Sequence, residues 1–340
     1  MNRVAFIVHV IGIIAITILF TGCERKPANE VVVYTSLDQT FSQPIAEIFE
    51  RDTGIAVKVV YDTEATKTTG LVNRLIAEKN NPQADVFWNS ETARTIQLNR
   101  AGVLAPYESP SAKDIPDQFK DSEHYWTGFA ARARVLIVNT ELVPESEYPT
   151  SIFELVDPKW KGQVGLAYPL FGTTATHGAA LFSHLGDNVA KQYFQALKAN
   201  DVVIVDGNST AKDRVASGQL KIAITDTDDV NVAIAAGKPV TMIFPDKAGL
   251  GTLLIPNTVA LVAGGPNPGN GKKLIDFLLS RETESKLALS KAIQLPLREG
   301  VLKSDKVPDI SEITTMTVDF EKVADQMQPS GEFFQKLFVR

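Results

Sequence analysis

From residue 31 onward, the sequence alternates between short β-branched runs and stretches with helical spacing, and this alternation most restricts the possible fold. The segments 31–34, 55–61 and 84–88 are predicted strands because they are short, apolar and bounded by turn-forming residues. The segments 41–54 and 68–79 between them carry apolar residues at helical spacing. Such alternation predicts a mostly parallel sheet with helices on both faces, and therefore an α/β fold.

A second alternating block follows a Pro- and Ser-rich surface excursion at 106–117. It contains predicted strands at 164–167, 202–205, near 222 and at 240–244, with helices at 174–184 and 189–200 and a further helix that ends at 217. Helices at 272–279 and 283–290 come after the long predicted strand at 253–262. Two blocks predict two lobes, and ligands commonly bind in the cleft between lobes. The longest strands, 132–140 and 253–262, are expected to cross between the lobes, and an amphipathic helix is expected to include Ile313, Val318 and Met327.

The first residues have the pattern of an export signal. Arg3 precedes an apolar run at 4–20, and the sequence Leu-Phe-Thr-Gly then leads to Cys23. This arrangement resembles a bacterial lipobox, so we expect a signal peptide at 1–22, lipidation of Cys23 and a tether at 23–30. The apolar run is also long enough to be considered as a transmembrane anchor. Cys23 is the only cysteine, which excludes an intramolecular disulfide.

The net charge argues against nucleic acid as a partner. The 340-residue chain has 34 basic and 40 acidic residues, a net charge of -6. Removal of the predicted signal peptide removes only Arg3 from this count, leaving 33 minus 40, or -7. A mildly acidic, exported protein lacks the basic surface that phosphate backbones require.

The segment 226–229, Asp-Thr-Asp-Asp, follows a predicted buried strand and precedes a helix. The carboxylates of Asp226, Asp228 and Asp229 must repel one another unless a cation or hydrogen-bond donors offset the repulsion. Because ligands bind at the carboxyl ends of strands in open α/β sheets, we interpret this segment as part of a site. The alternative is that Asp228 or Asp229 caps the next helix.

Other polar loops also follow predicted strands, and the ends of parallel strands gather at one edge of a sheet. The segment Gly172-Thr173-Thr174 begins a helix, where free N–H groups and hydroxyls suit an anion, although plain helix capping is equally compatible. The remaining candidates from these loops are Ser36, Asp38, Ser90, Glu91, Asn208 and Ser209.

Arg132 and Arg134 lie on one face of a predicted strand and could hold a phosphate-like group or a carboxylate. They could equally pair with carboxylates on neighbouring strands, which we expect for at least one of them. His177 has no metal-ligand spacing to another histidine, so we expect it on a helix face or at a cap.

Several segments in order resemble one bacterial family. They are Val-Val-Tyr-Thr-Ser at 32–36, Phe-Glu-Arg-Asp-Thr-Gly-Ile at 49–55, Ala-Asp-Val-Phe-Trp at 84–88, Arg-Ala-Arg-Val at 132–135, Pro-Lys-Trp-Lys-Gly at 158–162 and Asp-Phe-Leu-Leu-Ser at 276–280. Together they resemble the extracellular solute-binding proteins of ABC importers, in the ferric-iron-binding branch. The resemblance implies a type II periplasmic binding fold with two hinge strands, with one lobe at 31–131 and 256–305 and the other at 132–255 and 306–340.

The same resemblance implies a ligand set, with changes. Iron-binding members use a histidine, a glutamate and a tyrosine pair. At the matching positions this chain has Asp38 in place of the histidine and Ser90 or Glu91 for the glutamate. Asp228 and Asp229 stand where the tyrosine pair would be. Without the tyrosines, phenolate coordination is lost, but carboxylates are hard oxygen ligands. The expected metal ligands are therefore Asp38, Glu91, Asp228 and Asp229. The anion-holding positions of the family are matched by Gly172, Thr173, Thr174, Asn208 and Ser209.

We therefore predict a monomeric, lipid-anchored periplasmic protein that passes its ligand to an ABC permease and has no catalytic cofactor. The expected ligand is Fe³⁺ or a similar hard cation with phosphate or another anion, ahead of a small molecule bearing a phosphate or phosphonate. An exported hydrolase with paired carboxylates is a further alternative, although no nucleophile–base pair is recognisable. A purely structural lipoprotein would show no stabilisation by any ligand.

Overall fold

The protein is described here from a computed structural model that covers residues 29–63 and 66–338, so the expected signal peptide and Cys23 lie outside the described residues. No helix in the described part of the chain has the length and apolar character needed to cross a membrane.

The first lobe is built on a sheet that starts with three strand–helix units. Its elements are β1 (Glu30–Thr35), α1 (Gln39–Thr53), β2 (Ala56–Tyr61), α2 (Thr69–Ala77), β3 (Val86–Asn89), α3 (Ala93–Arg100) and β4 (Leu104–Ala105). Strand β1 pairs in parallel with β2 and β3, as the alternating sequence predicted. Strand β10 (Leu254–Val262) lies antiparallel to β3, and α8 (Pro268–Leu278) and α9 (Arg281–Leu289) follow it.

The second lobe repeats this architecture on a smaller scale. Strands β6 (Val164–Ala167), β7 (Val203–Val205) and β8 (Ile222–Asp226) are parallel, and β9 (Val240–Ile243) pairs antiparallel with β5. The helices are α4 (Gly172–Leu185), α5 (Asp187–Ala199), α6 (Asn208–Ala216) and α7 (Thr227–Ala235). Short 3₁₀ turns occur at Pro110–Ala112, Asp117–Phe119, Glu145–Glu147, Ile152–Val156, Pro158–Trp160 and Ile310–Glu312.

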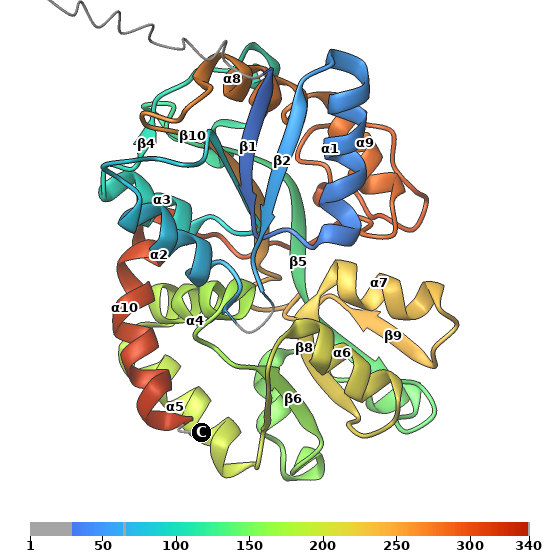
Figure 1. The fold of residues 1–340 in the computed structure, drawn as a ribbon. Helices are drawn as coiled ribbons and strands as arrows, with labels where there is room; N and C mark the ends of the chain where they lie inside the picture. The colour runs from blue at the N-terminus through green and yellow to red at the C-terminus, as the bar shows by residue number, and fades with distance from the viewer. Residues whose placement is uncertain (1–28, 64–65, 339–340) are drawn as a thin grey trace, which may run out of the picture.

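Strand β5 (Thr127–Asn139) connects the two lobes. Its first half pairs with β10 in the first lobe, whereas its second half pairs with β8 and β9 in the second lobe. All its residues are buried, and its second half is paired on both sides, with β8 and with β9. The second long strand, β10, finds its partners β3, β4 and β5 in the first lobe, and the chain enters it from the second lobe just before Leu254. Figure 1 shows β5 running from the upper lobe into the lower one.

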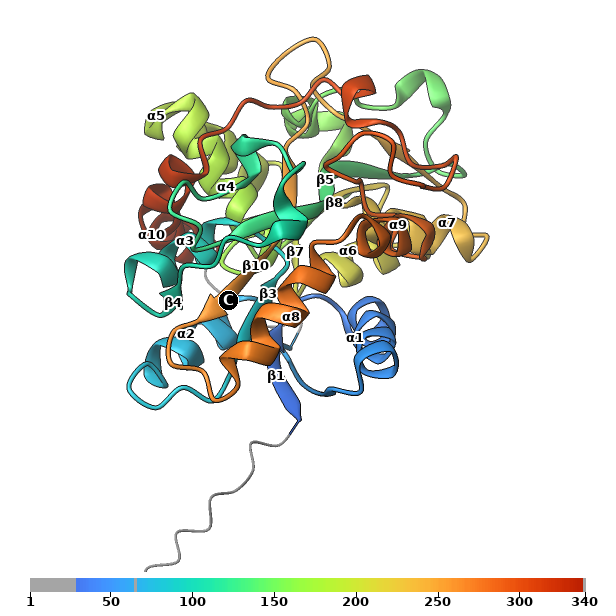
Figure 2. The same cartoon turned by 90° about the horizontal axis from the view of Figure 1, so that it is seen from above.

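The C-terminal helix α10 (Phe320–Leu337) contacts both lobes, lying beside α4 and α5 and reaching α3 (Figures 1 and 2). The predicted tail helix included Ile313 and Val318, and this boundary is wrong. Residue Asp319 is the N-cap, with its carboxylate accepting from the N–H groups of Glu321 and Lys322. The preceding segment is held instead by a bridge between Thr252 and Thr315.

Candidate functional site

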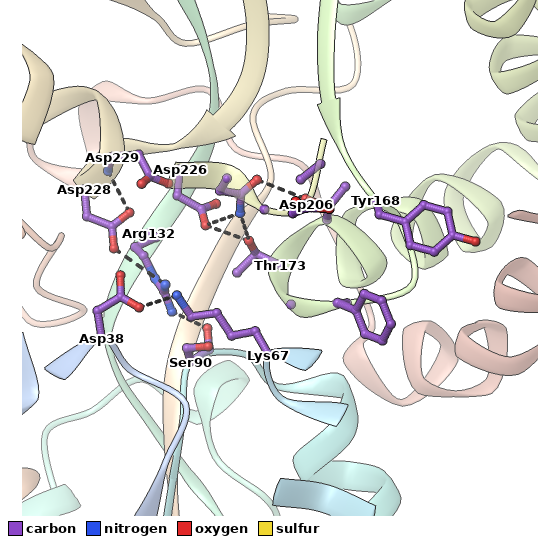
Figure 3. Close-up of a pocket in the computed structure, with 16 residues that line it drawn as sticks. Asp38, Lys67, Ser90, Arg132, Tyr168, Thr173, Asp206, Asp226, Asp228 and Asp229 are labelled. Atoms are coloured by element: carbon purple, nitrogen blue, oxygen red, sulfur yellow. Dashed lines mark hydrogen bonds and ion pairs between the residues drawn. The ribbon is translucent and has the colours of Figure 1, made fainter. Parts of the chain in front are cut away.

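A polar pocket lies between the two lobes, at the carboxyl ends of strands from both (Figure 3). Its internal volume is only about 20 Å³. Since a cavity of roughly 10–15 Å³ holds one water, this space is about that of one or two water molecules. The lining residues are Asp38, Lys67, Ser90, Arg132, Ala167, Tyr168, Phe171, Gly172, Thr173, Thr174, Asp206, Gly207, Asn208, Asp226, Asp228 and Asp229.

Three helices of the second lobe begin at this pocket. Helix α7 starts at Thr227, directly after β8, whereas α4 starts at Gly172 and α6 at Asn208, after short connections from β6 and β7. The first N–H groups of a helix have no acceptor within the helix, and the aligned peptide dipoles place partial positive charge there. Gly172 has a φ of +55°, which a glycine adopts without strain. The three helix starts therefore create a positive field around the carboxylates that follow β8.

Asp226 accepts hydrogen bonds from three side chains of the protein. Its carboxylate accepts from the Arg134 guanidinium at 2.7 Å, the Thr173 hydroxyl at 2.6 Å and the Asn208 amide at 3.0 Å. Arg134 and Asp226 are also register partners on β5 and β8. Burial by itself would raise the pKa of Asp226, but the guanidiniums of Arg134 and Arg132 outweigh burial and lower it from its usual value. The expectation that one arginine pairs with a carboxylate on a neighbouring strand is confirmed.

Asp228 and Asp229 are in the opposite situation. Asp228 has an ion pair with Arg132 at 3.6 Å, and Asp229 accepts hydrogen bonds from the Ser209 and Thr225 hydroxyls at 3.2 and 2.9 Å. Burial raises the pKa of Asp228 well above its usual value, with Asp229 adding to the rise and Arg132 opposing it. Burial, followed by the charge of Asp226, raises the pKa of Asp229 to about 6. The surroundings of these two carboxyls therefore oppose their negative charge, which a bound cation would stabilise.

The carboxylate oxygens of Asp226, Asp228 and Asp229 lie within 4.8 Å of one another, a spacing that one metal ion could bridge. The capping alternative for Asp228 and Asp229 is wrong, because α7 begins at Thr227 and the N-cap position belongs to Asp226, whose side chain makes no capping bond. Both acids lie in the first turn instead, where the helix field favours negative charge.

The first lobe contributes charged groups of both signs to the opposite side of the pocket. Lys67 forms an ion pair with Asp38. Arg132 donates to the Ser90 carbonyl and to the Asn257 side chain, and its buried Nε has no hydrogen-bond partner among the described residues. Figure 3 shows Asp38, Lys67 and Ser90 grouped below Arg132, with Asp228 above it.

Four residues expected at the site do not line the pocket. The Ser36 hydroxyl donates to the Asn89 side chain, and the Arg134 guanidinium donates to Asp226. The Ser209 hydroxyl donates a hydrogen bond to Asp229, which itself lines the pocket. Glu91 is buried and accepts from Asn89, from the N–H of Arg94 and from the hydroxyl of Thr176 across the lobes. In this conformation Glu91 bonds the two lobes together and does not face the pocket. Of the four expected metal ligands, only Asp38, Asp228 and Asp229 therefore line the pocket.

Sequence reasoning missed Lys67, Tyr168, Phe171 and Asp206 as lining residues. Asp206 directly follows β7, so the rule that selected Asn208 would also have found it. Lys67 comes from the connection between β2 and α2, where no local pattern marks it. The ring of Tyr168 lies apart from the acids and points away from them (Figure 3). His177 lies within α4, in line with the expected helix-face position, and it is buried; burial with the charge of Arg134 lowers its pKa to about 3.

Comparison with known proteins identifies the family. The profile described as "Bacterial extracellular solute-binding protein" matches residues 45–315, which is most of the chain. The chain belongs to this family. The pocket between the lobes is accordingly the place to look for the solute.

Individual relatives extend this result. The chain is 26% identical to iron uptake protein A1 from a Synechocystis species, over 94% of this chain and 92% of the relative. It is 29% identical to a putative 2-aminoethylphosphonate-binding periplasmic protein of Salmonella typhimurium, over 79% and 77%. Iron-bound HitA from Pseudomonas aeruginosa shares the fold with a TM-score of 0.82, covering 91% of this chain and 99% of HitA at 22% identity. The predicted two-lobed, type II periplasmic binding fold is confirmed.

Proposed function

We propose that this solute-binding protein captures Fe³⁺, or a similarly hard cation, together with a small anion, and delivers it to an ABC permease without chemical turnover. The proximity of the Asp226, Asp228 and Asp229 oxygens carries the proposal. Oxygen-rich carboxylate sites suit hard cations, and a bound cation would offset the burial and the mutual repulsion that raise the pKa of Asp228 and Asp229. The relatives named for iron support the same ligand class.

The charge of the pocket favours a cation. Carboxylates outnumber cationic side chains in the lining, with Lys67 and Arg132 as the cations and Asp38, Asp206, Asp226, Asp228 and Asp229 as the acids. A volume of about 20 Å³ is too small for an organic molecule or for a phosphate beside the metal, so either ligand requires the lobes to separate further. Arg132 and the start of α4 supply donors for the accompanying anion.

Binding of Fe³⁺ in the presence of phosphate tests this proposal. We expect the wild-type protein to bind one Fe³⁺ in equilibrium dialysis and to show a rise in melting temperature that grows with free metal. The double variant Asp228→Asn with Asp229→Asn should lose both effects. Asp213→Asn is the matched control, because Asp213 lies on α6 as an exposed partner of Lys212. Equal binding by the double variant would overturn the proposed ligand site.

A phosphate- or phosphonate-bearing small molecule is the second candidate. The buried guanidinium of Arg132, with its Nε unpartnered among the described residues, favours an anionic group, and the Salmonella relative is named for a phosphonate. Such a ligand requires the lobes to separate beyond the present volume. Calorimetric titration with 2-aminoethylphosphonate distinguishes the candidates, since binding to metal-free protein would favour this second ligand.

We also propose that the mature protein is a monomer anchored by lipid on Cys23, which lies outside the described residues. One acyl chain gives only marginal membrane binding, whereas the multiple acyl chains of a lipoprotein hold it firmly. Cys23→Ala should move the protein from the membrane fraction to the soluble fraction and leave its melting temperature unchanged. If the variant remains in the membrane fraction, the apolar run at 4–20 is an uncleaved anchor instead.

A further inference from the structure

Lys67 brings a fixed positive charge into a pocket dominated by acids. Its ammonium is paired with Asp38, and its side chain is largely shielded from solvent. Lys67 faces acids of the opposite lobe, because Lys67 and Asp229 both line the pocket between the lobes. Figure 3 shows Lys67 extended beneath Arg132 with its amino group at Asp38.

The backbone fixes Lys67 in this position. Its carbonyl accepts a hydrogen bond of 3.0 Å from the N–H of Gly172, at the start of α4 in the opposite lobe. The next residue, Thr68, has a φ of +68°, a conformation that a β-branched residue rarely adopts. Strain of this kind persists where the surrounding structure imposes it and is concentrated at functional sites. The chain therefore turns sharply at Thr68 and presents Lys67 to the cleft.

We propose that Lys67 is a built-in competitor of the bound cation. In the metal-free protein the Lys67 ammonium is paired with the Asp38 carboxylate, so a metal ion must displace this ammonium to bind Asp38. After the ion has bound, the charge of Lys67 still repels it. This inference rests on the proposed function, because it presumes a cationic solute. By limiting affinity, Lys67 would allow release of a solute that carboxylates otherwise hold tightly.

The physical argument fixes the sign of the effect. Removal of the ammonium frees Asp38 as a ligand and removes a repulsion that scales with the charge of the ion. The affinity for a trivalent ion should therefore increase more than the affinity for a divalent ion. In the metal-free protein, however, the same removal leaves Asp38 unpaired opposite Asp228 and Asp229. Stability without metal should fall while metal affinity rises, and a merely structural role cannot produce these opposite changes.

The test compares Lys67→Met, Lys67→Arg and Lys58→Met with the wild type. Lys58 pairs with Glu30 on the outer strand pair and does not line the pocket, so it controls for the loss of one charge. Binding is measured with Fe³⁺ buffered by nitrilotriacetate and, separately, with Mn²⁺. We expect Lys67→Met to bind Fe³⁺ at least about tenfold more tightly and Mn²⁺ with a smaller gain, while Lys67→Arg and Lys58→Met stay within about threefold of wild type.

The outcomes separate this inference from the proposed function. If the wild type binds Fe³⁺ and Lys67→Met binds it equally or more weakly, Lys67 is not a competitor, although the proposed function stands. If neither protein binds Fe³⁺, both ideas fail. If only Lys67→Met binds Fe³⁺, the competitor role is supported in its strongest form. If the wild type binds 2-aminoethylphosphonate and Lys67→Met does not, Lys67 binds the phosphonate group, and its role as a competitor of a cation is overturned.

Discussion

Asp226 and Asp229 lie three positions apart, yet the protein stabilises charge on one and opposes it on the other. Arg134 and Arg132 hold Asp226 in its charged form. Asp229 has two hydroxyl donors and no arginine within its hydrogen-bond partners, so burial dominates and raises its pKa to about 6. The protein itself thus stabilises the negative charge of Asp226, whereas a ligand would have to stabilise that of Asp229.

The raised pKa of Asp229 predicts a pH-dependent loss of stability. An unfolded aspartate has a pKa of about 3.9, so between about pH 4 and pH 6 the folded state binds more protons than the unfolded state. Stability must then fall as pH rises through this window. Asp229→Asn should remove this component, so that the variant gains stability over wild type from pH 4 to pH 6. Urea unfolding at several pH values, with a chelator present, measures the difference. A constant difference across that range would contradict the assignment.

Asp226→Asn should have the opposite consequence. It leaves the guanidinium of Arg134, which is 1% exposed, without its counter-charge in the interior. Breaking one partner of a buried ion pair costs about 3–5 kcal/mol, so the free energy of unfolding should fall by that amount near pH 7. Asp229→Asn is the matched comparison from the same segment and should cost nothing there. A loss below about 1 kcal/mol for Asp226→Asn would show that Arg134 is neutralised by another group.

The sequence predicted which polar residues gather at the ends of the strands, but not which side chains contact one another there. The carboxyl ends of strands correctly indicated where Asp228, Thr173 and Asn208 would gather, because parallel strands share an edge. The pairing of Arg134 with Asp226 depends on the register of β5 against β8, which no local pattern specifies. Lys67 could not be found for the same reason, since the opposite lobe fixes its position.

Among the elements, helices α4 and α10 meet at an unusually close approach. Phe334 of α10 packs against Phe182 and Phe194, with ring centroids 5.7 and 4.6 Å away. A Cβ atom added at Gly178 of α4 would lie 2.6 Å from the Phe334 ring. The glycine therefore provides the space in which the aromatic ring sits.

Gly178→Ala should destabilise the protein by about 1–2 kcal/mol. Alanine favours a helix by about 1 kcal/mol over glycine. Against this gain, an added methyl group that presses on a ring confined by other rings costs typically 1–3 kcal/mol. Gly269→Ala in α8 is the control, because its added Cβ meets no atom within 4 Å and should cost nothing. Chemical unfolding measures both variants. If Gly178→Ala is neutral, α10 adjusts its position on α4 freely.

The pattern of elements was predictable from periodicity, whereas helix ends depended on single side chains. Apolar spacing in the tail continued before Phe320, so the pattern alone extended the helix to residue 313. The cap at Asp319 and the bridge between Thr252 and Thr315 decide otherwise. Caps and bridges are contacts of one or two residues, and periodicity over a window does not detect them.

At the scale of the whole molecule, hydrogen bonds across the cleft hold the lobes together. The Thr176 hydroxyl donates to Glu91 at 2.8 Å, Arg94 donates to the Leu170 carbonyl at 3.2 Å, and Gly172 donates to Lys67 at 3.0 Å. Strand β5 is continuous through both lobes and can act as a hinge. Ligand affinity must then depend on the cost of bringing the lobes together, even for residues outside the pocket.

Thr176→Val tests this dependence. Thr176 is buried and does not line the pocket, so its replacement leaves the carboxylates of the site unchanged. Loss of a hydrogen bond to a charged acceptor is worth about 1.5–3 kcal/mol, which should favour separated lobes and weaken Fe³⁺ binding by at least about tenfold. The radius of gyration of the metal-free variant, measured by small-angle X-ray scattering, should exceed that of the wild type.

The control for Thr176→Val is Thr258→Val, because Thr258 is equally buried but its hydroxyl bonds Thr95 and the Glu91 carbonyl within the first lobe. This variant should lose stability without a change in radius of gyration, and its Fe³⁺ affinity should stay within about twofold of wild type. If both variants weaken binding equally, the effect comes from general destabilisation. If Thr176→Val changes neither affinity nor radius, Glu91 and Thr176 do not contribute to lobe closure, and the remaining cross-lobe bonds at Leu170 and Lys67 must hold the cleft.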